Sequence, residues 1–467
     1  MASLFALLNQ AASSLAAHRA VIGTAGHNIQ NVNTPGYARQ RVDLAAALPA
    51  DRVGAGFVGR GVVVQSITQL RDRFFEMQYP QSAATAARSE AESTALQGVH
   101  ALDPELPGGV GAALAAFYST VRAVAADAGN PGLRQGVVSS ARALALSFNR
   151  TGEALRQARL GIDVRLDSLA EAANGLSQQI AELNRQIRVS SNSSGGAPPN
   201  DLLDARARAR DELARITGAV PVTDTDGNVS MILATGASLV SGDHASRLST
   251  YPDPANDGHL AFRLQRPDGS FEDRPALGGA IGGNLDARDG AIKAAQDQLD
   301  QLAWEFAEEV NTVHQLGFDA YGDPGLDLFE VGATQAGAAR RVAVNAAILA
   351  DPSLLAPSET ATGVPGNGGN FLALGQIEDR LLPGGATTVA TFAGIVSGFG
   401  AAAARSKSLA SHDATLLANI DAMRESVSGV SIDEELITMS QAQRAYDAVS
   451  KVIATTDELL DTLMKLR

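Results

Sequence analysis

Apolar residues recur at alternating steps of four and three along the first part of the chain. The stripe consists of Leu4, Leu8, Ala11, Leu15, His18, Ile22, Ala25, Ile29 and Val32. This is the heptad spacing of a helix that packs against another helix along one seam. Such a helix is about 40 Å long and, by itself, leaves its apolar stripe in water. The pattern therefore predicts a partner helix.

The C-terminal end of the chain has the same spacing. Its stripe consists of Ile432, Leu436, Met439, Ala442, Tyr446, Val449, Ile453, Thr456, Leu460 and Leu463. We expect the two ends to pack together as a coiled coil, because each large apolar side chain contributes about 1.5 to 3 kcal/mol on burial. The small residues of both stripes contribute little, so the pair is expected to be marginal in a single chain. Both ends are then mobile until neighbouring copies cover the remaining apolar edge.

The middle of the chain contains two more helical patterns. The first has a strict seam of Ile162, Leu166, Leu169, Ala173, Leu176, Ile180, Leu183 and Ile187. A loop over 190–200 follows, and Asn200 or Asp201 can cap a returning helix, which predicts an antiparallel helical hairpin. The second pattern predicts a helix over 285–314.

Between these helices the pattern becomes that of short strands. Residues 229–233 and 260–264 are β-prone runs. They are bounded by Asp226-Gly227, Asp257-Gly258 and Asp268-Gly269, and Asp-Gly pairs are typical hairpin turns. The sequence therefore predicts a small β-rich insertion within a helical body.

These elements together predict a mainly α fold with a β-rich insertion, divided into three domains. The predicted division is a terminal coiled-coil domain of residues 1–75 and 420–467, a helical middle domain of 76–217 and 284–419 with a loop-rich segment at 317–370, and a β-rich insertion at 218–283.

Composition and charge narrow the function classes. The chain has 467 residues, a formal net charge of -14 and only 4% aromatic residues. Nucleic acid is not expected as a partner, because its binding depends on clustered Lys and Arg. The chain has no Cys. We expect no membrane span and no Sec signal, because no apolar run is long enough and no basic segment precedes one at the N-terminus.

Several short motifs resemble chemical sites but are better explained by structure. Gly54–Gly59 spells the dinucleotide-binding pattern, yet a β-prone run follows where a helix is required. Asp224–Asn228 resembles a calcium loop without its bidentate Glu. The seven His residues lack metal-ligand spacing. Asp433–Glu435 is interpreted as a solvated helix start. We therefore expect no enzyme, catalytic residue, metal or cofactor.

Residues 27–37, His-Asn-Ile-Gln-Asn-Val-Asn-Thr-Pro-Gly-Tyr, form a block of a different kind. Pro35 prevents the helix from continuing and Gly36 allows a turn. The block closely resembles the N-terminal signature of the flagellar axial proteins. Residues 59–74 resemble the next block of that family, and residues 428–463 are similar to its closing helix.

The interior of the chain resembles the hook-associated protein 1 family among these axial proteins. The resemblance lies in Asn200-Asp201-Leu202-Leu203-Asp204, in the helical hairpin before it, and in the block Gly282–Asp289 before a long helix. It implies paired terminal helices that line a tube, a helical middle domain and an outward β domain. The alternatives are a hook or rod subunit, or a non-flagellar secreted coiled-coil protein.

The resemblance also implies a structural role and a set of partners. Copies would form a ring between hook and filament, in contact with hook subunits and with a second hook-associated protein or filament-side subunits. An export chaperone would bind the C-terminal helix over 432–463, and the protein would reach the extracellular flagellum through the flagellar type III channel. The expected assembly interface consists of Leu4, Leu8, Leu15, Ile22, Ile29, Asn31, Asn33, Thr34, Pro35, Gly36, Tyr37, Ile432, Leu436, Met439, Tyr446, Val449, Ile453, Leu460 and Leu463.

Overall fold

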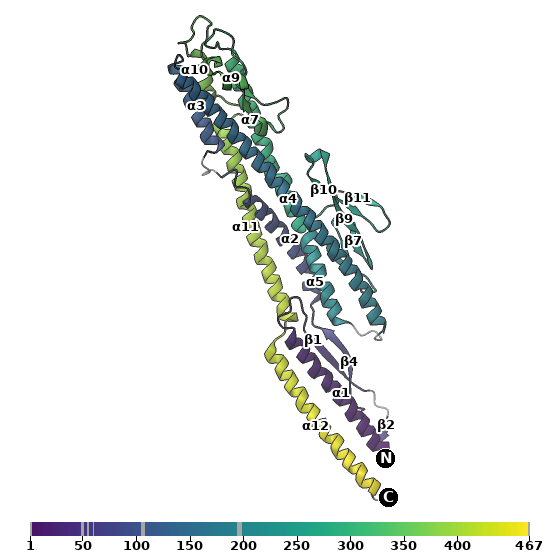
Figure 1. The fold of residues 1–467 in the computed structure, drawn as a ribbon. Coiled ribbons are helices and arrows are strands. Elements are labelled where there is room, and N and C mark those ends of the chain that lie inside the picture. The colour runs from purple at the N-terminus through teal and green to yellow at the C-terminus, as the bar shows by residue number, and fades with distance from the viewer. Residues whose placement is uncertain are drawn as a thin grey trace.

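The protein is long and narrow, and helices form most of it (Figure 1). The computed structural model describes residues 2–47, 51–53, 56–58, 60–103, 108–193 and 199–465. The N- and C-termini lie together at one extremity, and a larger helical body extends away from them (Figure 1). The coarse prediction of a mainly α protein with small sheets is confirmed.

Two helices form the narrow end of the molecule. Helix α1 (Ala2–Gln30) and helix α12 (Ile432–Lys465) lie side by side and run in opposite directions (Figure 1). Strands β1 (Gln40–Ala46) and β4 (Val62–Gln69) form an antiparallel pair that packs against α1. We call α1, α12 and this pair of strands the terminal rod.

A second, shorter hairpin extends from the first. Its strands are β2 (Asp51–Val53) and β3 (Gly56–Val58), which pair antiparallel. Gly54 and Gly59, the outer glycines of the predicted bend, lie outside the described residues.

The body is a bundle of long helices. Its main elements are α2 (Arg73–Gln97), α3 (Val110–Ala126), α4 (Pro131–Ser193), α5 (Asn200–Thr217), α6 (Gly279–Asp286), α7 (Lys293–Gln315) and α11 (Thr388–Ser428). Helices α4 and α5 form the predicted antiparallel hairpin, and α11 packs along α2. Helix α11 ends close to the terminal rod, where α12 begins (Figure 1).

Helix α4 is much longer than its heptad seam. The seam predicts a helix from Ile162, whereas α4 begins at Pro131 and has 63 residues. Proline suits the first turn of a helix because that turn needs no donated backbone N–H. Leu144, Phe148 and Leu155 are fully buried and extend the apolar face upstream. The helix continues because this upstream face packs on α3 and α7.

Five aromatic side chains gather in one core at the far end of the body. Phe117, Tyr118, Phe148, Phe306 and Phe329 are all at most 1% exposed. Their rings meet edge-on or tilted, with centroids 5.4–6.3 Å apart. Such contacts add to the free energy gained by burial alone, so this cluster holds α3, α4 and α7 together.

The helix predicted over 285–314 begins earlier and is not uniform. Helix α6 starts at Gly279, a π-helical turn covers Ala287–Ile292, and α7 ends at Gln315. Helix α6 crosses α2 closely, since a Cβ at Gly283 would lie 1.9 Å from the Arg88 carbonyl oxygen. Only glycine fits there, which explains the glycine pair that precedes the long helix.

The insertion contains two antiparallel sheets that pack on α4. One has the strand order β5-β6-β7-β8 and the other β11-β10-β9. Their strands are β5 (Val220–Thr223), β6 (Val229–Ile232), β7 (Ser238–Ser241), β8 (His244–Ala245), β9 (Arg247–Pro252), β10 (Leu260–Gln265) and β11 (Phe271–Asp273). All three Asp-Gly pairs lie in turns between paired strands, and their glycines have positive φ.

A buried ionic network holds the second sheet against α4. The Asp163 carboxylate contacts His259 Nδ1 at 2.6 Å and also accepts a hydrogen bond from Arg288. Arg288 lies in the π-helical turn and is 2% exposed. The turn therefore provides the cation that compensates a carboxylate removed from water.

The segment 317–370 contains short elements joined by loops. They are β12 (Phe329–Glu330), α8 (Ala338–Arg341), β13 (Ala343–Val344), α9 (Ala346–Ala350) and a 3-10 turn at Pro352–Leu354. Helix α10 (Gly369–Gly375) then packs on α3. Within the described residues, no helix combines the length and the apolarity that a membrane crossing requires.

Candidate functional site

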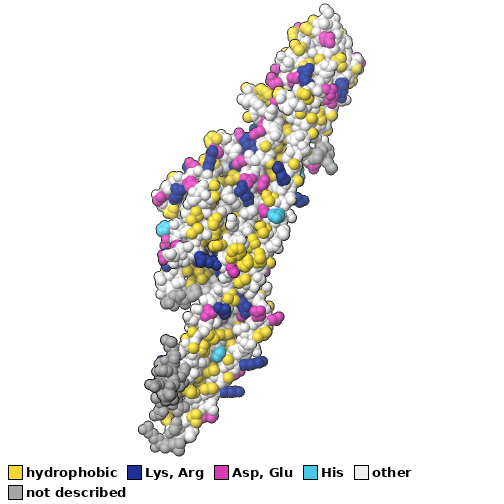
Figure 2. All heavy atoms as spheres, turned by 180° about the vertical axis from the view of Figure 1, so that it is seen from behind, with side chains coloured by type: hydrophobic (Ala, Val, Ile, Leu, Met, Phe, Trp, Pro, Cys, Tyr) yellow, Lys and Arg dark blue, Asp and Glu magenta, His cyan; other side chains and the backbone are white. Residues whose placement is uncertain are grey.

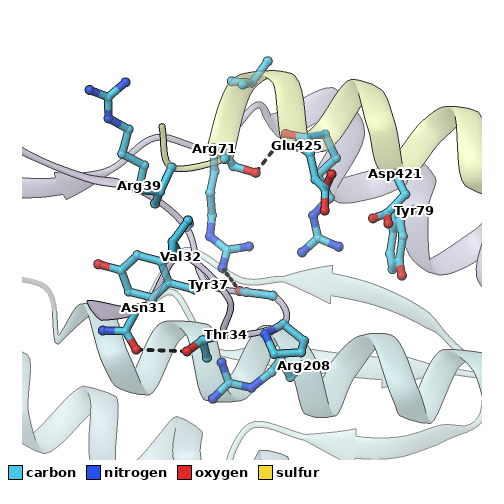
Figure 3. A pocket seen from close by; sticks show the side chains of 18 of the residues that line it. Asn31, Val32, Thr34, Tyr37, Arg39, Arg71, Tyr79, Arg208, Asp421 and Glu425 are labelled. Atoms are coloured by element: carbon cyan, nitrogen blue, oxygen red, sulfur yellow. Dashed lines mark hydrogen bonds between the residues drawn. The ribbon is translucent and has the colours of Figure 1, made fainter. Parts of the chain in front are cut away.

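The terminal rod meets the body at a compact joint. The joint surrounds an open, largely polar cavity of about 1000 Å³ (Figure 3). Its walls are the turn after α1, the short link between α11 and α12, and the facing sides of α2, α5 and α11. Four segments distant in sequence therefore converge where the rod is attached.

The turn after α1 is built by the Asn-Thr-Pro-Gly-Tyr block. The Asn31 side chain donates to the His27 carbonyl oxygen at 3.0 Å, which also accepts the Asn31 backbone N–H at 3.2 Å at the end of the helix. Thr34 Oγ1 donates to Asn31 Oδ1 at 3.1 Å (Figure 3). Gly36 has φ +73°, and a Cβ there would lie 2.8 Å from the Arg208 side chain. The block thus fixes where α1 ends and how the chain reverses.

Asn28 is the centre of a buried hydrogen-bond network with Tyr37, Gln40 and Glu435, which we call the latch. Its Nδ2 donates to the Gln40 carbonyl oxygen at 2.9 Å and to Glu435 Oε2 at 3.0 Å. Its Oδ1 accepts from the Gln40 N–H at 3.0 Å and from the Tyr37 hydroxyl at 2.8 Å. Asn28 is 1% exposed. All four hydrogen bonds open to an amide side chain are therefore made, to three different elements.

Glu435 connects this latch to α12. Its other carboxylate oxygen accepts from Arg39 Nε at 2.6 Å, while Arg39 also reaches Glu434 at 2.7 Å. The Arg39 N–H donates to the Ser428 carbonyl oxygen at 2.9 Å. The interpretation of Asp433–Glu435 as wholly solvated is thus wrong for Glu435, which is 3% exposed because Asn28 and Arg39 replace its water.

Burial and neighbouring carboxylates keep the Tyr37 phenol neutral. Burial raises the pKa of Tyr37, and the charges of Asp204, Asp201 and Glu435 raise it further. A neutral phenol keeps its proton and can donate it to Asn28.

The N-terminus of α5 holds the hairpin of the terminal rod. Asn200 Nδ2 donates to the Ile67 carbonyl oxygen at 3.0 Å. Gln69 Nε2 donates to the Asn200 carbonyl oxygen at 2.9 Å and to Asp204 Oδ1 at 2.8 Å. The Asn-Asp-Leu-Leu-Asp block therefore forms the first turn of α5 and also forms hydrogen bonds with the end of β4.

A cluster of alternating charges lies beneath the joint. Glu76 contacts Arg71 and Arg210 at 2.8 Å and Arg424 at 3.2 Å, and Arg424 also contacts Asp211 at 3.1 Å. Burial by itself would raise the pKa of Glu76, but Arg210, Arg71 and Arg424 together lower it. This cluster connects α2, α5 and α11 through paired charges.

The apolar residues predicted for assembly lie along α1 and α12. Those that are half-buried are Leu8, Leu15, Ile22, Ile29, Met439, Tyr446, Val449, Ile453 and Leu460. Ile432 and Leu436 are exposed, at 46% and 45%. Leu4 and Leu463 belong to α1 and α12, but their side chains lie outside the described part of the chain.

The polar residues predicted for assembly lie in the joint. Asn31 and Tyr37 are half-buried, whereas Asn33, Thr34, Pro35 and Gly36 are exposed and line the cavity. The sequence prediction missed Asn28, Arg39, Gln40 and Glu435. Nothing in the local sequence singled out the contact of Asn28 with Glu435, because residues 407 positions apart leave no local pattern.

Exposed apolar side chains continue along the terminal rod and the adjoining part of the body. Those on α1 and α12 are Phe5, Leu7, Ile432, Leu436, Ile437, Val452, Leu459 and Met464. Those on α2 and α11 near the joint are Phe74, Met77, Met423 and Val427. Figure 2 shows apolar side chains gathered along the lower end and the middle of one face. Patches of this kind mark interaction surfaces.

Two family models match the chain. The model described as the helical domain of flagellar hook-associated protein FlgK matches residues 104–329. The model described as the C-terminal region of the flagellar basal body rod FlgEFG protein matches residues 424–466, which include α12.

Several curated relatives are named flagellar hook-associated protein 1. The Escherichia coli (strain K12) protein is 30% identical over 329 residues, which cover 70% of this chain and 60% of that protein. The Salmonella typhimurium protein is 31% identical over 70% of this chain and 59% of its own length. The chain thus spans about 60% of these two relatives. The Bacillus subtilis (strain 168) protein is 28% identical over 99% of this chain and 98% of its own length.

A solved structure has the same fold. The flagellar hook junction protein FlgK from Burkholderia pseudomallei superposes with a TM-score of 0.64 at 20% identity, covering 76% of this chain and 100% of that one.

Proposed function

Since the chain belongs to the flagellar hook-associated protein 1 family, we propose that it is a structural subunit of the bacterial flagellum that forms the junction between hook and filament. In this proposal the protein is not an enzyme, and its function is to present a shaped surface to its neighbours. The match of the FlgK helical-domain model over the body supports this assignment over a hook or rod subunit.

The observation that carries the proposal is the terminal rod. Two helices from opposite ends of the chain lie side by side, and their outer faces keep large apolar side chains in water. Val452, Leu459 and Met464 are 45%, 57% and 75% exposed. In a monomer these exposed side chains contribute no free energy of burial, whereas packing between copies would bury them.

The three predicted domains have different positions in the proposed assembly. The proposed terminal coiled-coil domain of residues 1–75 and 420–467 lines a tube, and the helical middle domain surrounds it. The insertion at 218–283 faces outward. The fact that both segments of the proposed terminal domain meet the body at one joint supports this division.

The proposed partners follow from the same arrangement. Copies self-associate in a ring, contact hook subunits below, and contact a second hook-associated protein or filament-side subunits above. The predicted apolar residues of α1 and α12 and the block 31–37 form the interface. Before assembly, an export chaperone covers α12, and the chain leaves the cell through the flagellar type III channel to an extracellular site.

Deletion of the gene in its own bacterium tests the junction assignment. We expect hooks without filaments in electron micrographs and flagellin released into the medium, both reversed by the intact gene. Cells that lack hooks would instead indicate a hook or rod subunit, and normal filaments would contradict a junction role.

A further inference from the structure

The apolar seam between α1 and α12 does not by itself select one register. Its most buried members are small: Ala11, Ala25, Ala442 and Thr456, at 6%, 2%, 5% and 3% exposed. The larger members are only half-buried. Because both stripes repeat every seven residues, sliding α12 by one heptad again places apolar residues against apolar residues.

The latch around Asn28 is sensitive to such a slide. In the observed register Asn28 meets Glu435, and both side chains are almost fully buried. A slide of one heptad would replace Glu435 by Ala442, so one Asn28 N–H and the Arg39 guanidinium would lose their acceptor. A buried donor without a partner is unfavourable, whereas the apolar seam is hardly changed.

We infer that Asn28 and Glu435 are positioning residues that fix the register of α12 on α1. A single buried polar contact is known to select register between helices whose apolar seams are degenerate. Here the contact is asymmetric, because Gln40 and Tyr37 also hold Asn28 in place, and neither residue belongs to α12. Helix α12 is therefore aligned against a template made by α1, the turn after it and β1.

This register decides the height at which the outward-facing residues of α12 lie along the terminal rod. Antiparallel helices advance equally for each residue, so the contact between Asn28 and Glu435 sets Leu15 level with Ala448, next to Val449 of the α12 stripe. The exposed residues Val452 and Leu459 lie beside this seam on α12. The consequence for assembly rests on the proposed function, but the register itself is a property of the isolated chain.

Disulfide trapping measures the register directly, because the chain has no Cys of its own. One full-length variant carries Leu15→Cys and Val449→Cys, and a matched variant carries Leu15→Cys and Thr456→Cys, which reports the slide of one heptad that puts Ala442 in the place of Glu435. In the otherwise unchanged chain, the first pair should cross-link at least about tenfold more than the second. Oxidation traps the pair even if it forms only part of the time. Equal cross-linking of the two pairs, or none of the first, would overturn the inference.

Substitution of the latch should remove this preference. With Asn28→Leu or Glu435→Leu, the two Cys pairs should cross-link to a similar extent, whereas Glu435→Gln keeps an acceptor for Asn28 and should retain the preference. Amide exchange in α4 verifies that the body is folded in each variant. If both Leu variants keep the original preference, the seam or the short link between α11 and α12 sets the register and the inference is wrong. Since no assembly is measured, this result is independent of the junction assignment.

Discussion

Gly36 is the residue at which the turn after α1 depends most on side-chain size. Its φ of +73° is in the left-handed region, and Arg208 from α5 occupies the space where a Cβ would project. Both constraints act at the joint, where Tyr37 must return towards Asn28. The position therefore requires glycine for conformational and steric reasons together.

We predict that Gly36→Ala lowers the free energy of unfolding by about 1–2 kcal/mol, because L-residues are disfavoured at this φ. Urea unfolding monitored by circular dichroism measures the change. Gly175→Ala is the matched control, because Gly175 lies within α4 with nothing within 4 Å of its Cβ position. It should stabilise the protein by up to about 1 kcal/mol. Equal effects of the two variants would contradict the prediction.

His314 is a fully buried residue whose two ring nitrogens have opposite roles. Nδ1 lies 2.5 Å from the Leu326 carbonyl oxygen and donates to it, while Nε2 accepts from the Ala356 N–H at 3.1 Å. A protonated ring would direct Nε2–H at that N–H. Burial lowers the pKa of His314 from 6.5 to about 4. The ring is therefore neutral in the folded protein, and it connects α7 to the segment that follows it.

This lowered pKa predicts a loss of stability in mild acid. The unfolded chain binds a proton at His314 below pH 6.5, but the folded chain does so only near pH 4. The contribution of neutral His314 to the free energy of unfolding is therefore complete above pH 6.5 and falls as the pH decreases towards 4. The loss amounts to about 3 kcal/mol at most. Urea unfolding between pH 7 and pH 4 should show a smaller pH dependence for His314→Gln than for the unchanged chain. His412→Gln, at an exposed position of α11, should keep it. An unchanged slope in His314→Gln would refute the argument.

At the scale of elements, α1 and α12 form a pair whose seam combines buried alanines with half-buried large residues. A charge in such a seam is desolvated without a partner, which disfavours packing. The helical body does not depend on this seam, because its core lies around α3, α4 and α7.

Leu15→Asp or Leu460→Asp should therefore allow synthesis and folding of the body but prevent assembly. Complementation of the deletion strain, followed by counting filaments in electron micrographs, measures this, and we expect fewer than about one tenth of the usual filaments. Leu372→Asp, at a 58% exposed position of α10 at the far end of the body, should assemble normally. Normal filaments with either seam variant would contradict the packing argument.

The periodicity of apolar residues predicted which helices and strands exist better than it predicted where each one begins and ends. The hairpin of α4 and α5 and the turns of the insertion follow from residues close in sequence. The first half of α4 was missed because Leu144, Phe148 and Leu155 face several elements, which hides a simple seam. The π-helical turn at Ala287–Ile292 was missed because it depends on contacts with α4 and with the insertion.

The position of the joint was predictable from the sequence, but the hydrogen bonds that form it were not. The Asn-Thr-Pro-Gly-Tyr block was identified from its residues, and its role as a turn follows from Pro35 and Gly36. The acceptor for Asn28 was not predictable, since Glu435 is 407 positions away and lies in an acidic run typical of a solvated helix start. Only the fold brings the two together.

At the scale of the whole molecule, the terminal rod and the body differ in how much surface each buries. The body has one continuous apolar core, whereas the rod leaves large side chains in water. We predict that amides of α1 and α12 exchange with solvent much faster than those in the buried part of α4 in a dilute monomer, and slow down on assembly. Hydrogen exchange with mass spectrometry measures both states. Strong protection of both terminal helices in the monomer would contradict this.

The position of both termini at one extremity has a practical consequence for labelling the protein. A fluorescent or affinity tag fused to either end would sit on the terminal rod, so moving it from one end to the other would not relieve a steric conflict. The turn at Asp268-Gly269 is exposed, lies in the insertion, and has open space around its glycine. A short epitope inserted there is the better choice for imaging.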